Sequence, residues 1–312
     1  MTDAPMIEAV GLVKTFGGTT AVRDLSFDVG RGEVLGLLGP NGAGKTTTLD
    51  MLTTLLPLDG GRATVAGFDV ANQPRRVRRV IGLAGQAAAV DEMLTARENL
   101  RLFGWLYRME RSTVTRRVDE VVDRFGLAEF ADRPASTYSG GERRRLDVAA
   151  ALIADPPVVF LDEPTVGLDP RSRTALWQTI TDLSERGTTI VLTTQYLEEA
   201  DRLADRIVLI GQGRTLAEGT PRELKTSLER DVLEVEVATD NDLTSARQVL
   251  GSSVVVPAPD ERVLHLPIGG QAPAPLVALR SLQDAGVAVT EFQLRRPTLD
   301  DVFLTLTEEQ PA

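Results

Sequence analysis

The sequence predicts an α/β fold with a parallel sheet, followed by a smaller α+β domain. The apolar run 34–38 ends in a glycine-rich turn, and helical spacing follows from 45 to 56. This order of strand, turn and helix is typical of phosphate-binding loops. Further short apolar runs at 158–161, 190–193 and 207–210 are separated by helices or turns. Such runs indicate parallel strands that are buried on both faces.

The remaining elements of the first part follow in order. Residues 7–13 and 21–29 have the apolar patterns of strands, and the stretch from 95 to 154 is helical throughout. We therefore expect a nucleotide-binding domain over 1–228, with a helical subdomain inserted at about 87–155. The clearest helices of this subdomain are expected at 98–107, 114–125 and 142–153.

The C-terminal part, 229–312, carries most of the net charge of −11. Its pattern is β-α-β-β-α-β, which predicts a small acidic α+β domain of ferredoxin-like type, with a role in assembly or regulation. The expected elements are 232–237, 243–250, 253–256, 263–266, 275–285 and 289–294.

Composition limits the function classes. A chain of 312 residues with 42% apolar content can form two or three domains. The longest apolar stretches, such as 148–153, fall far short of the roughly 18 residues needed to cross a bilayer. We therefore expect no membrane span, and with no readable secretion signal and no cysteines we expect a cytosolic protein. The net negative charge argues against binding to nucleic acid.

The turn after the first buried strand is a complete phosphate loop, Gly39-Pro40-Asn41-Gly42-Ala43-Gly44-Lys45-Thr46. Its glycines let backbone N–H groups converge on phosphate oxygens, and the following helix points its positive end at them. Lys45 is expected to neutralise the β- and γ-phosphates of ATP, and Thr46 to place its hydroxyl on Mg²⁺.

A second strand supplies the carboxylates that hydrolysis needs. Asp162 and Glu163 follow the apolar run 158–161. Asp162 is expected to hold Mg²⁺, and Glu163 to polarise the attacking water as general base. An Asp-Glu pair alone is commonplace, and only the phosphate loop gives it this meaning.

The segment Ser139-Gly140-Gly141-Glu142-Arg143 resembles the signature motif of ATP-binding-cassette proteins, and the resemblance covers about 7–224. It implies an ABC-type P-loop NTPase domain. In that family the signature of one chain caps the nucleotide held by another, so Ser139, Gly140, Gly141 and Glu142 are expected to act in trans in a homodimer around two ATP molecules. A helix cap alone explains Ser139 but not the two glycines.

The resemblance assigns further positions. It implies that Gln86 touches Mg²⁺ or the attacking water and that Asp169 belongs to a loop at the dimer interface. Phe16 matches the aromatic platform for adenine, although a single phenylalanine is also compatible with a core position. The expected ATP-binding residues are Phe16, Gly39, Pro40, Asn41, Gly42, Ala43, Gly44, Lys45, Thr46 and Thr47; the expected metal ligands are Thr46, Gln86 and Asp162; and the expected catalytic residues are Glu163, Gln195 and Gln86.

Gln195 departs from the family pattern, because most relatives have a histidine there. The sole histidine, His265, lies far along the chain and is expected to be an ordinary strand residue. An amide can donate to a phosphate oxygen but cannot carry a proton near neutral pH. Glu163 is therefore expected to act as the base of a slow but real ATPase.

Two segments narrow the resemblance to the daunorubicin-resistance group of drug-export ATPases: Thr193–Asp201 and Arg295–Phe303. The group implies an ATP-hydrolysing subunit, peripheral at the cytoplasmic face of the membrane. It would power efflux of a drug or natural product through a separate multi-span membrane subunit. The alternatives are a ribosome- or chromosome-associated ABC ATPase and an ATP-dependent regulatory switch.

Three surface features have two interpretations each. The arginine clusters 75–79 and 143–145 could meet lipid headgroups or nucleic acid, but solvated faces are favoured. The apolar side chains of 98–107 could flank a groove for a helix of the membrane partner, or could equally form the core of the subdomain.

Overall fold

The computed structural model describes residues 4–86, 89–227, 231–251, 254, 262–268 and 275–308. The chain divides into two compact units, Met1–Thr220 and Pro221–Ala312. This division falls before the expected boundary at 228, because helix α8 (Pro221–Ser227) contacts α11 (Leu299–Glu308) of the second unit.

A six-stranded sheet forms the centre of the first unit, in the order β10-β9-β3-β8-β7-β6. All neighbouring strands are parallel except β10, which pairs antiparallel with β9. The strands expected from the apolar runs are therefore present and adjacent. Their bounds are β3 Val34–Leu38, β6 Ile81–Ala84, β7 Val158–Asp162, β8 Thr189–Thr194, β9 Arg206–Gly211 and β10 Arg214–Gly219.

Both faces of this sheet are covered, which explains its uninterrupted apolar strands. In β7, Val158 and Phe160 point into one hydrophobic core, whereas Val159 and Leu161 point into another. All four side chains are fully buried. Because successive side chains of a strand point to opposite faces, a strand between two cores must be apolar at every position.

One face is covered by α1 and a second, antiparallel sheet with the order β2-β1-β4-β5. The first two of these strands were expected from the sequence, but β4 and β5 were not. The bounds are β1 Ile7–Phe16, β2 Thr19–Val29, α1 Lys45–Leu52, β4 Gly60–Val65 and β5 Phe68–Asp69.

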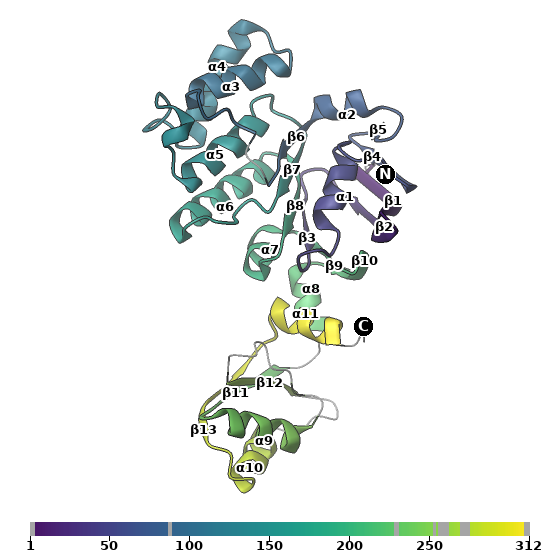
Figure 1. The fold of residues 1–312 in the computed structure, drawn as a ribbon, viewed down its shortest axis with the longest axis vertical. Helices are drawn as coiled ribbons and strands as arrows, with labels where there is room; N and C mark the ends of the chain where they lie inside the picture. The colour runs from purple at the N-terminus through teal and green to yellow at the C-terminus, as the bar shows by residue number, and fades with distance from the viewer. Residues whose placement is uncertain are drawn as a thin grey trace. The chain divides into compact units, whose positions relative to one another are not determined.

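The other face is covered by helices, and Figure 1 shows α5 and α6 on the opposite side of β7 and β8 from α1. The helical subdomain expected from the sequence is present, with α3 packed on both α4 and α5. The bounds of the remaining helices of this unit are α2 Pro74–Val80, α3 Ala96–Leu106, α4 Arg111–Arg124, the 3₁₀ turn η1 Ala135–Thr137, α5 Gly140–Ala151, α6 Pro170–Glu185 and α7 Leu197–Leu203.

The second unit holds a three-stranded antiparallel sheet with the order β12-β11-β13. Its core joins Leu233 and Val235 of the central strand to Ala278 and Leu282 of a helix. The strand expected at 253–256 lies, apart from Val254, outside the described residues. The bounds are β11 Asp231–Val237, α9 Asp240–Leu250, β12 Val263–Ile268, α10 Pro275–Asp284 and β13 Val289–Arg295.

None of the helices in the described ranges combines the length and the apolar character needed to cross a membrane.

Candidate functional site

The expected catalytic groups meet at the carboxyl ends of adjacent parallel strands. The phosphate loop follows β3, Asp162 ends β7, Gln195 follows β8, and Gln86 comes two residues after β6. Ligands of open α/β sheets bind at this edge, because the loops that leave it diverge around a crevice. The topology therefore brings together groups that lie far apart in the sequence.

The loop glycines have separate structural reasons. A Cβ on Gly39 would strike the carbonyl oxygen of Ile210, and a Cβ on Gly44 would lie 2.5 Å from that of Ala21. Gly42 has φ +80° and open space around its missing Cβ. Gly39 and Gly44 therefore allow close backbone packing, whereas Gly42 provides the left-handed turn of the open cradle.

Lys45 begins α1 and is almost fully buried. Its Nζ donates to the carbonyl oxygens of Gly39 at 2.8 Å and Pro40 at 3.0 Å, and lies 3.7 Å from Glu163 Oε1. Burial lowers the pKa of Lys45, and the negative charges of Glu163 and Asp162 oppose that shift. The amine is thus held within the loop, between the turn and the paired carboxylates.

The three expected metal ligands are linked by hydrogen bonds. Thr46 Oγ1 donates to Asp162 Oδ1 at 3.1 Å and accepts from Gln86 Nε2 at 3.2 Å. A hydroxyl, a carboxylate and an amide are hard oxygen ligands of the kind that Mg²⁺ takes together with phosphate and water. The donor set therefore fits Mg²⁺.

Glu163 has an unusual backbone conformation, with φ +46°. Its N–H donates to Thr193 Oγ1 at 2.9 Å and is also directed at the Thr193 carbonyl oxygen at 3.1 Å, while the Thr193 hydroxyl donates to Asp162. A non-glycine residue with positive φ is strained, and such strain persists only where the surroundings enforce it. Thr193 was not among the residues expected at this site from the sequence. Its signal is a hydroxyl at the end of β8, in register with Asp162.

Two further expected residues stand at the ends of strands in the first unit. Gln195 is half-buried directly after β8. Phe16 ends β1 with 45% of its surface exposed, so it is not a core residue. The Lys14 Nζ lies 5.6 Å from the centre of the Phe16 ring and is held by Asp59. An exposed phenyl ring can offer its face to a base, as a stacking platform requires.

The signature residues begin α5 with a capping box. Ser139 Oγ accepts from Glu142 N–H at 3.2 Å, and Glu142 Oε2 accepts from Ser139 N–H at 2.7 Å. A Cβ on Gly141 would lie 2.5 Å from Ser172 Oγ, whereas one on Gly140 would have no atom of the described residues within 4 Å. The chain's own packing therefore explains Ser139 and Gly141, but not Gly140.

Asp169 caps the next helix, α6. Its carboxylate accepts from the backbone N–H groups of Arg171 and Ser172, and from the Ser172 hydroxyl at 2.6 Å. Ser172 also faces Gly141. The signature and the Asp169 loop therefore lie side by side on the surface of the first unit, where both are exposed at Ser139, Gly140 and Asp169.

The interpretation of 143–145 as a solvated face is wrong for Arg144. This side chain is only 10% exposed and donates to three backbone carbonyls and the buried Asp147. Arg143, in contrast, pairs with the exposed Glu92. Sequence alone cannot separate these neighbours, because adjacent helical residues point 100° apart and only the packing decides which one faces inward.

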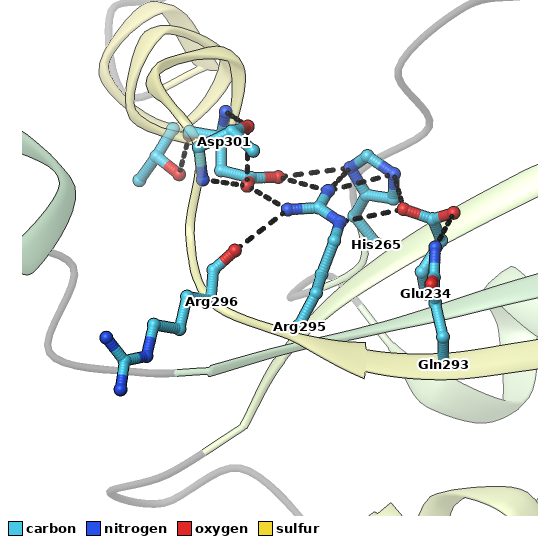
Figure 2. A network of polar contacts seen from close by, with 8 residues as sticks. Glu234, His265, Gln293, Arg295, Arg296 and Asp301 are labelled. Carbon is cyan, nitrogen blue, oxygen red and sulfur yellow. Dashed lines mark hydrogen bonds and ion pairs between the residues drawn. The ribbon is translucent and has the colours of Figure 1, made fainter. Parts of the chain in front are cut away.

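His265 is also more than an ordinary strand residue. Figure 2 shows it in a polar network of the second unit, with Nδ1 at 3.1 Å from Asp301 Oδ1 and Nε2 at 3.3 Å from Glu234 Oε2. Arg295 donates to both carboxylates. Burial by itself would raise the pKa of Asp301, but hydrogen bonds from His265, Arg295 and Thr298 outweigh it and hold this pKa well below its usual range.

Comparison with known proteins identifies the family of this chain. Residues 22–166 match the model of the ABC transporter family, and residues 219–307 match the C-terminal domain of DrrA1-3-like ATP-binding proteins. The chain is 49% identical over 309 residues to the daunorubicin resistance ATP-binding protein DrrA2 of Streptomyces coeruleorubidus, which covers 98% of this chain and 96% of that protein. It is 40% identical to the Nod factor export ATP-binding protein I of Ralstonia nicotianae, covering 98% and 94%.

Solved structures show the same fold. A dimeric ATP-binding cassette in a post-hydrolysis state, bound to ADP and Pi, is 26% identical with a TM-score of 0.64, covering 69% of this chain and 98% of that one. The fold and the site thus define an ABC-type P-loop ATPase. The chain belongs to the ABC transporter family, among the ATP-hydrolysing subunits that carry a DrrA-type C-terminal domain. The family and the fold class expected from the sequence are confirmed.

Proposed function

We propose that this chain hydrolyses Mg²⁺-ATP at the carboxyl edge of the parallel sheet to power export of an amphipathic drug or natural product. In this proposal the phosphate loop from Gly39 to Thr47 binds the phosphates, and Thr46, Asp162 and Gln86 hold Mg²⁺. Glu163 acts as general base, because Gln195 can donate a hydrogen bond but cannot titrate. Mg²⁺ would supply charge neutralisation at the phosphates.

A single observation supports these roles most strongly. Gln86, Thr46 and Asp162 form one hydrogen-bonded row, and Thr193 joins Asp162 to the backbone of Glu163. Residues from four segments of the chain, which are the proposed metal ligands and Thr193, thus lie next to the proposed base. Because phosphoryl transfer depends mainly on positioning and charge stabilisation, such a fixed array is what hydrolysis needs.

We further propose that the active form is a homodimer. Ser139 and Gly140 are exposed at the start of a helix, where backbone N–H groups attract anions. Among the described residues, none packs closely enough against Gly140 to require a glycine there. The dimeric, nucleotide-bound form of a related cassette supports an arrangement in which this helix start meets the ATP held by the second chain.

A separate membrane subunit completes the proposed transporter and places this chain at the cytoplasmic face. Helix α3 supports this proposal, because Leu100 is buried in the core while Trp105 and Leu106 are 53% and 67% exposed. The helix thus contributes to the core of the subdomain through Leu100, while its C-terminal end is exposed. The exposed end offers apolar side chains that a short helix of the partner could cover.

The cargo is proposed only by chemical class. One relative bears the name of daunorubicin resistance and another that of Nod factor export, although both share the architecture of this chain along nearly its whole length. The selection of cargo therefore belongs to the membrane partner, since function resides in sites and not in folds.

The central test is Glu163→Gln, which removes the base and keeps the size of the side chain. We expect the turnover of ATP by purified dimer to fall about 100-fold or more, because general base catalysis contributes roughly 10²–10⁴-fold. ATP binding should persist, because the phosphate loop is unchanged. Phosphate release and equilibrium nucleotide binding measure the two quantities.

The exposed Glu129 offers the matched control, and Glu129→Gln should turn over ATP at the wild-type rate. Wild-type turnover no faster than that of Glu163→Gln would contradict the assignment of the base. It would favour the regulatory-switch alternative instead.

A further inference from the structure

We propose that Arg144 is a positioning residue for hydrolysis, and that with Asp147 it ties the signature helix to Glu163 and to the loop of Gln86. This inference rests on the proposed role of Glu163. Arg144 and Asp147 lie one turn apart on α5, which begins at the signature, and both are buried in the first unit.

The guanidinium of Arg144 bonds the chain on both sides of Glu163. Its Nη2 donates to the carbonyl oxygen of Asp162 at 2.8 Å, and its Nε donates to that of Pro164 at 2.9 Å. The planar fork of arginine holds these two carbonyls at a fixed spacing. The residue between them is Glu163, whose φ of +46° is the strained conformation that needs such support.

The same side chain reaches the loop that carries Gln86. Nη1 donates to the carbonyl oxygen of Gly85, which directly precedes Gln86. Nη1 also donates to Asp147 Oδ2 at 3.1 Å, and Asp147 Oδ1 accepts from the N–H of Ala89 at 2.8 Å. The pair therefore bonds the loop at Gly85 and again at Ala89, on either side of Gln86.

The buried carboxylate of Asp147 matches the buried cation. Burial raises the pKa of Asp147, and the hydrogen bond from Ala89 and the charge of Arg144 oppose this shift. Burying a charged pair costs desolvation free energy that the attraction between the charges often only offsets. A contribution to folding stability alone is therefore a weak explanation for such a pair. Here, besides bonding each other, the two side chains bond backbone groups within three residues of the proposed base or the proposed metal ligand.

A mechanical consequence follows from the position of α5. Ser139 at its start is the group proposed to meet the ATP of the second chain, and Arg144 lies five positions further along the same helix. A rigid helix that shifts on dimer closure moves both ends together. Arg144 therefore conveys the closure of the signature to the backbone of Glu163 and to Gln86.

The test compares Arg144→Met and Arg144→Lys with wild type in the full chain. We expect Arg144→Met to lower kcat at least about tenfold while the Kd for ATP changes less than about threefold, because the phosphate loop is untouched. Arg144→Lys should not restore kcat, since one ammonium cannot bond three carbonyls in the geometry of the fork. Phosphate release and equilibrium binding of a fluorescent ATP analogue provide the two readouts.

Arg117 provides the matched structural control. It is a 12% exposed arginine of the same subdomain, and it also donates to two backbone carbonyls, those of Leu152 and Ile153. Arg117→Met should lower the melting temperature about as much as Arg144→Met does but leave kcat unchanged. If Arg144→Met does not fold, Asp147→Asn provides the test instead, because asparagine has nearly the same shape as aspartate. This variant should show a smaller loss of kcat, with the Kd for ATP unchanged.

Three results would overturn the inference while wild type hydrolyses ATP: kcat of Arg144→Met within twofold of wild type, full activity of Arg144→Lys, or equal losses of kcat in Arg144→Met and Arg117→Met. In the case that requires Asp147→Asn, unchanged kcat in that variant would have the same meaning. A wild-type dimer without hydrolysis would instead overturn the proposed function, and this inference with it.

Discussion

Two helices of the same subdomain begin with the same hydrogen-bonding device. At the start of α3, Thr95 accepts from Glu98 N–H at 3.2 Å and Glu98 accepts from Thr95 N–H at 2.9 Å. At the start of α5, Ser139 and Glu142 form the equivalent bonds at 3.2 and 2.7 Å. Both are complete capping boxes, which satisfy N–H groups that a helix start otherwise leaves without partners.

The residues that follow the two caps differ. Helix α3 continues with Ala96 and Arg97, whereas α5 continues with Gly140 and Gly141, which are poor helix formers. Gly141 is required by the close approach of Ser172, but Gly140 is not required by any described neighbour within 4 Å. The capping residues are thus explained by local structure. Gly140, which neither capping nor packing explains, is the residue that indicates a partner outside the chain.

The largest difference between the two helices is expected when the capping side chain of each is removed. Ser139→Ala and Thr95→Ala should each cost about 1 kcal/mol of folding stability, as lost N-caps do. Only Ser139→Ala should also reduce ATP turnover, by about tenfold or more, because the proposed contact with the second chain's nucleotide disappears. Urea unfolding and phosphate release measure the two effects. Equal turnover in both variants would leave Ser139 as a helix cap and nothing more.

Substitution of the two glycines by alanine should change the folding stability in opposite directions. Gly141→Ala should destabilise the fold by about 1–3 kcal/mol, because its Cβ would press on Ser172. Gly140→Ala should stabilise α5 by up to about 1 kcal/mol, since alanine is the better helix former. Turnover should nevertheless fall in Gly140→Ala if a nucleotide approaches this backbone.

Thermal unfolding and phosphate release again provide the readouts for the glycine pair. Ser172→Ala combined with Gly141→Ala serves as the control, because it removes the atom that the new Cβ would meet. A Gly140→Ala protein that is more stable and fully active would show that this glycine has no role at the dimer interface.

The smallest expected effect is a shared response to acid. Hydrogen bonds from the Thr95 backbone and hydroxyl lower the pKa of Glu98. Burial would raise the pKa of Glu142, but the bonds from Ser139 and the nearby Arg133 outweigh it and lower that pKa too. Because the folded-state pKa lies below the ordinary glutamate value, each carboxylate stabilises the fold above that value and loses its contribution as the pH falls through the folded-state pKa.

Urea midpoints at pH 7 and at about pH 4 should therefore drop slightly less in Glu98→Gln and Glu142→Gln than in wild type, since an amide can still accept the bond but does not titrate. A response in only one of the two variants would show that the caps are not equivalent. Exposed Glu129→Gln provides the baseline.

The sequence allowed most of the parallel sheet to be predicted, for a physical reason. Strands buried on both faces are apolar over most of their length, so β3, β7, β8 and β9 each contain a recognisable apolar run. β4 and β5 were missed because a partly exposed strand such as β4, with residues Gly60 and Gly61, has little apolar pattern.

The candidate site divides in the same way. Lys45, Asp162 and Ser139 lie in contiguous motifs, which local spacing can reveal. Thr193 and Arg144 act through contacts with residues far away in the sequence, 31 positions in the case of Thr193 and Asp162. Such partners depend on strand order and on which helix face is buried, and one sequence contains no direct signal for either.

The exposed ring of Phe16 has a consequence for nucleotide selectivity. A phenyl ring has a flat face but no donor or acceptor at its rim, so stacking rewards every purine to a similar degree. The nearby Lys14 Nζ already donates hydrogen bonds to Asp59 and to the carbonyl of Pro57, and these bonds compete with any bond to the edge of a base. In the role proposed for Phe16, this ring alone would therefore not discriminate between adenine and guanine nucleotides.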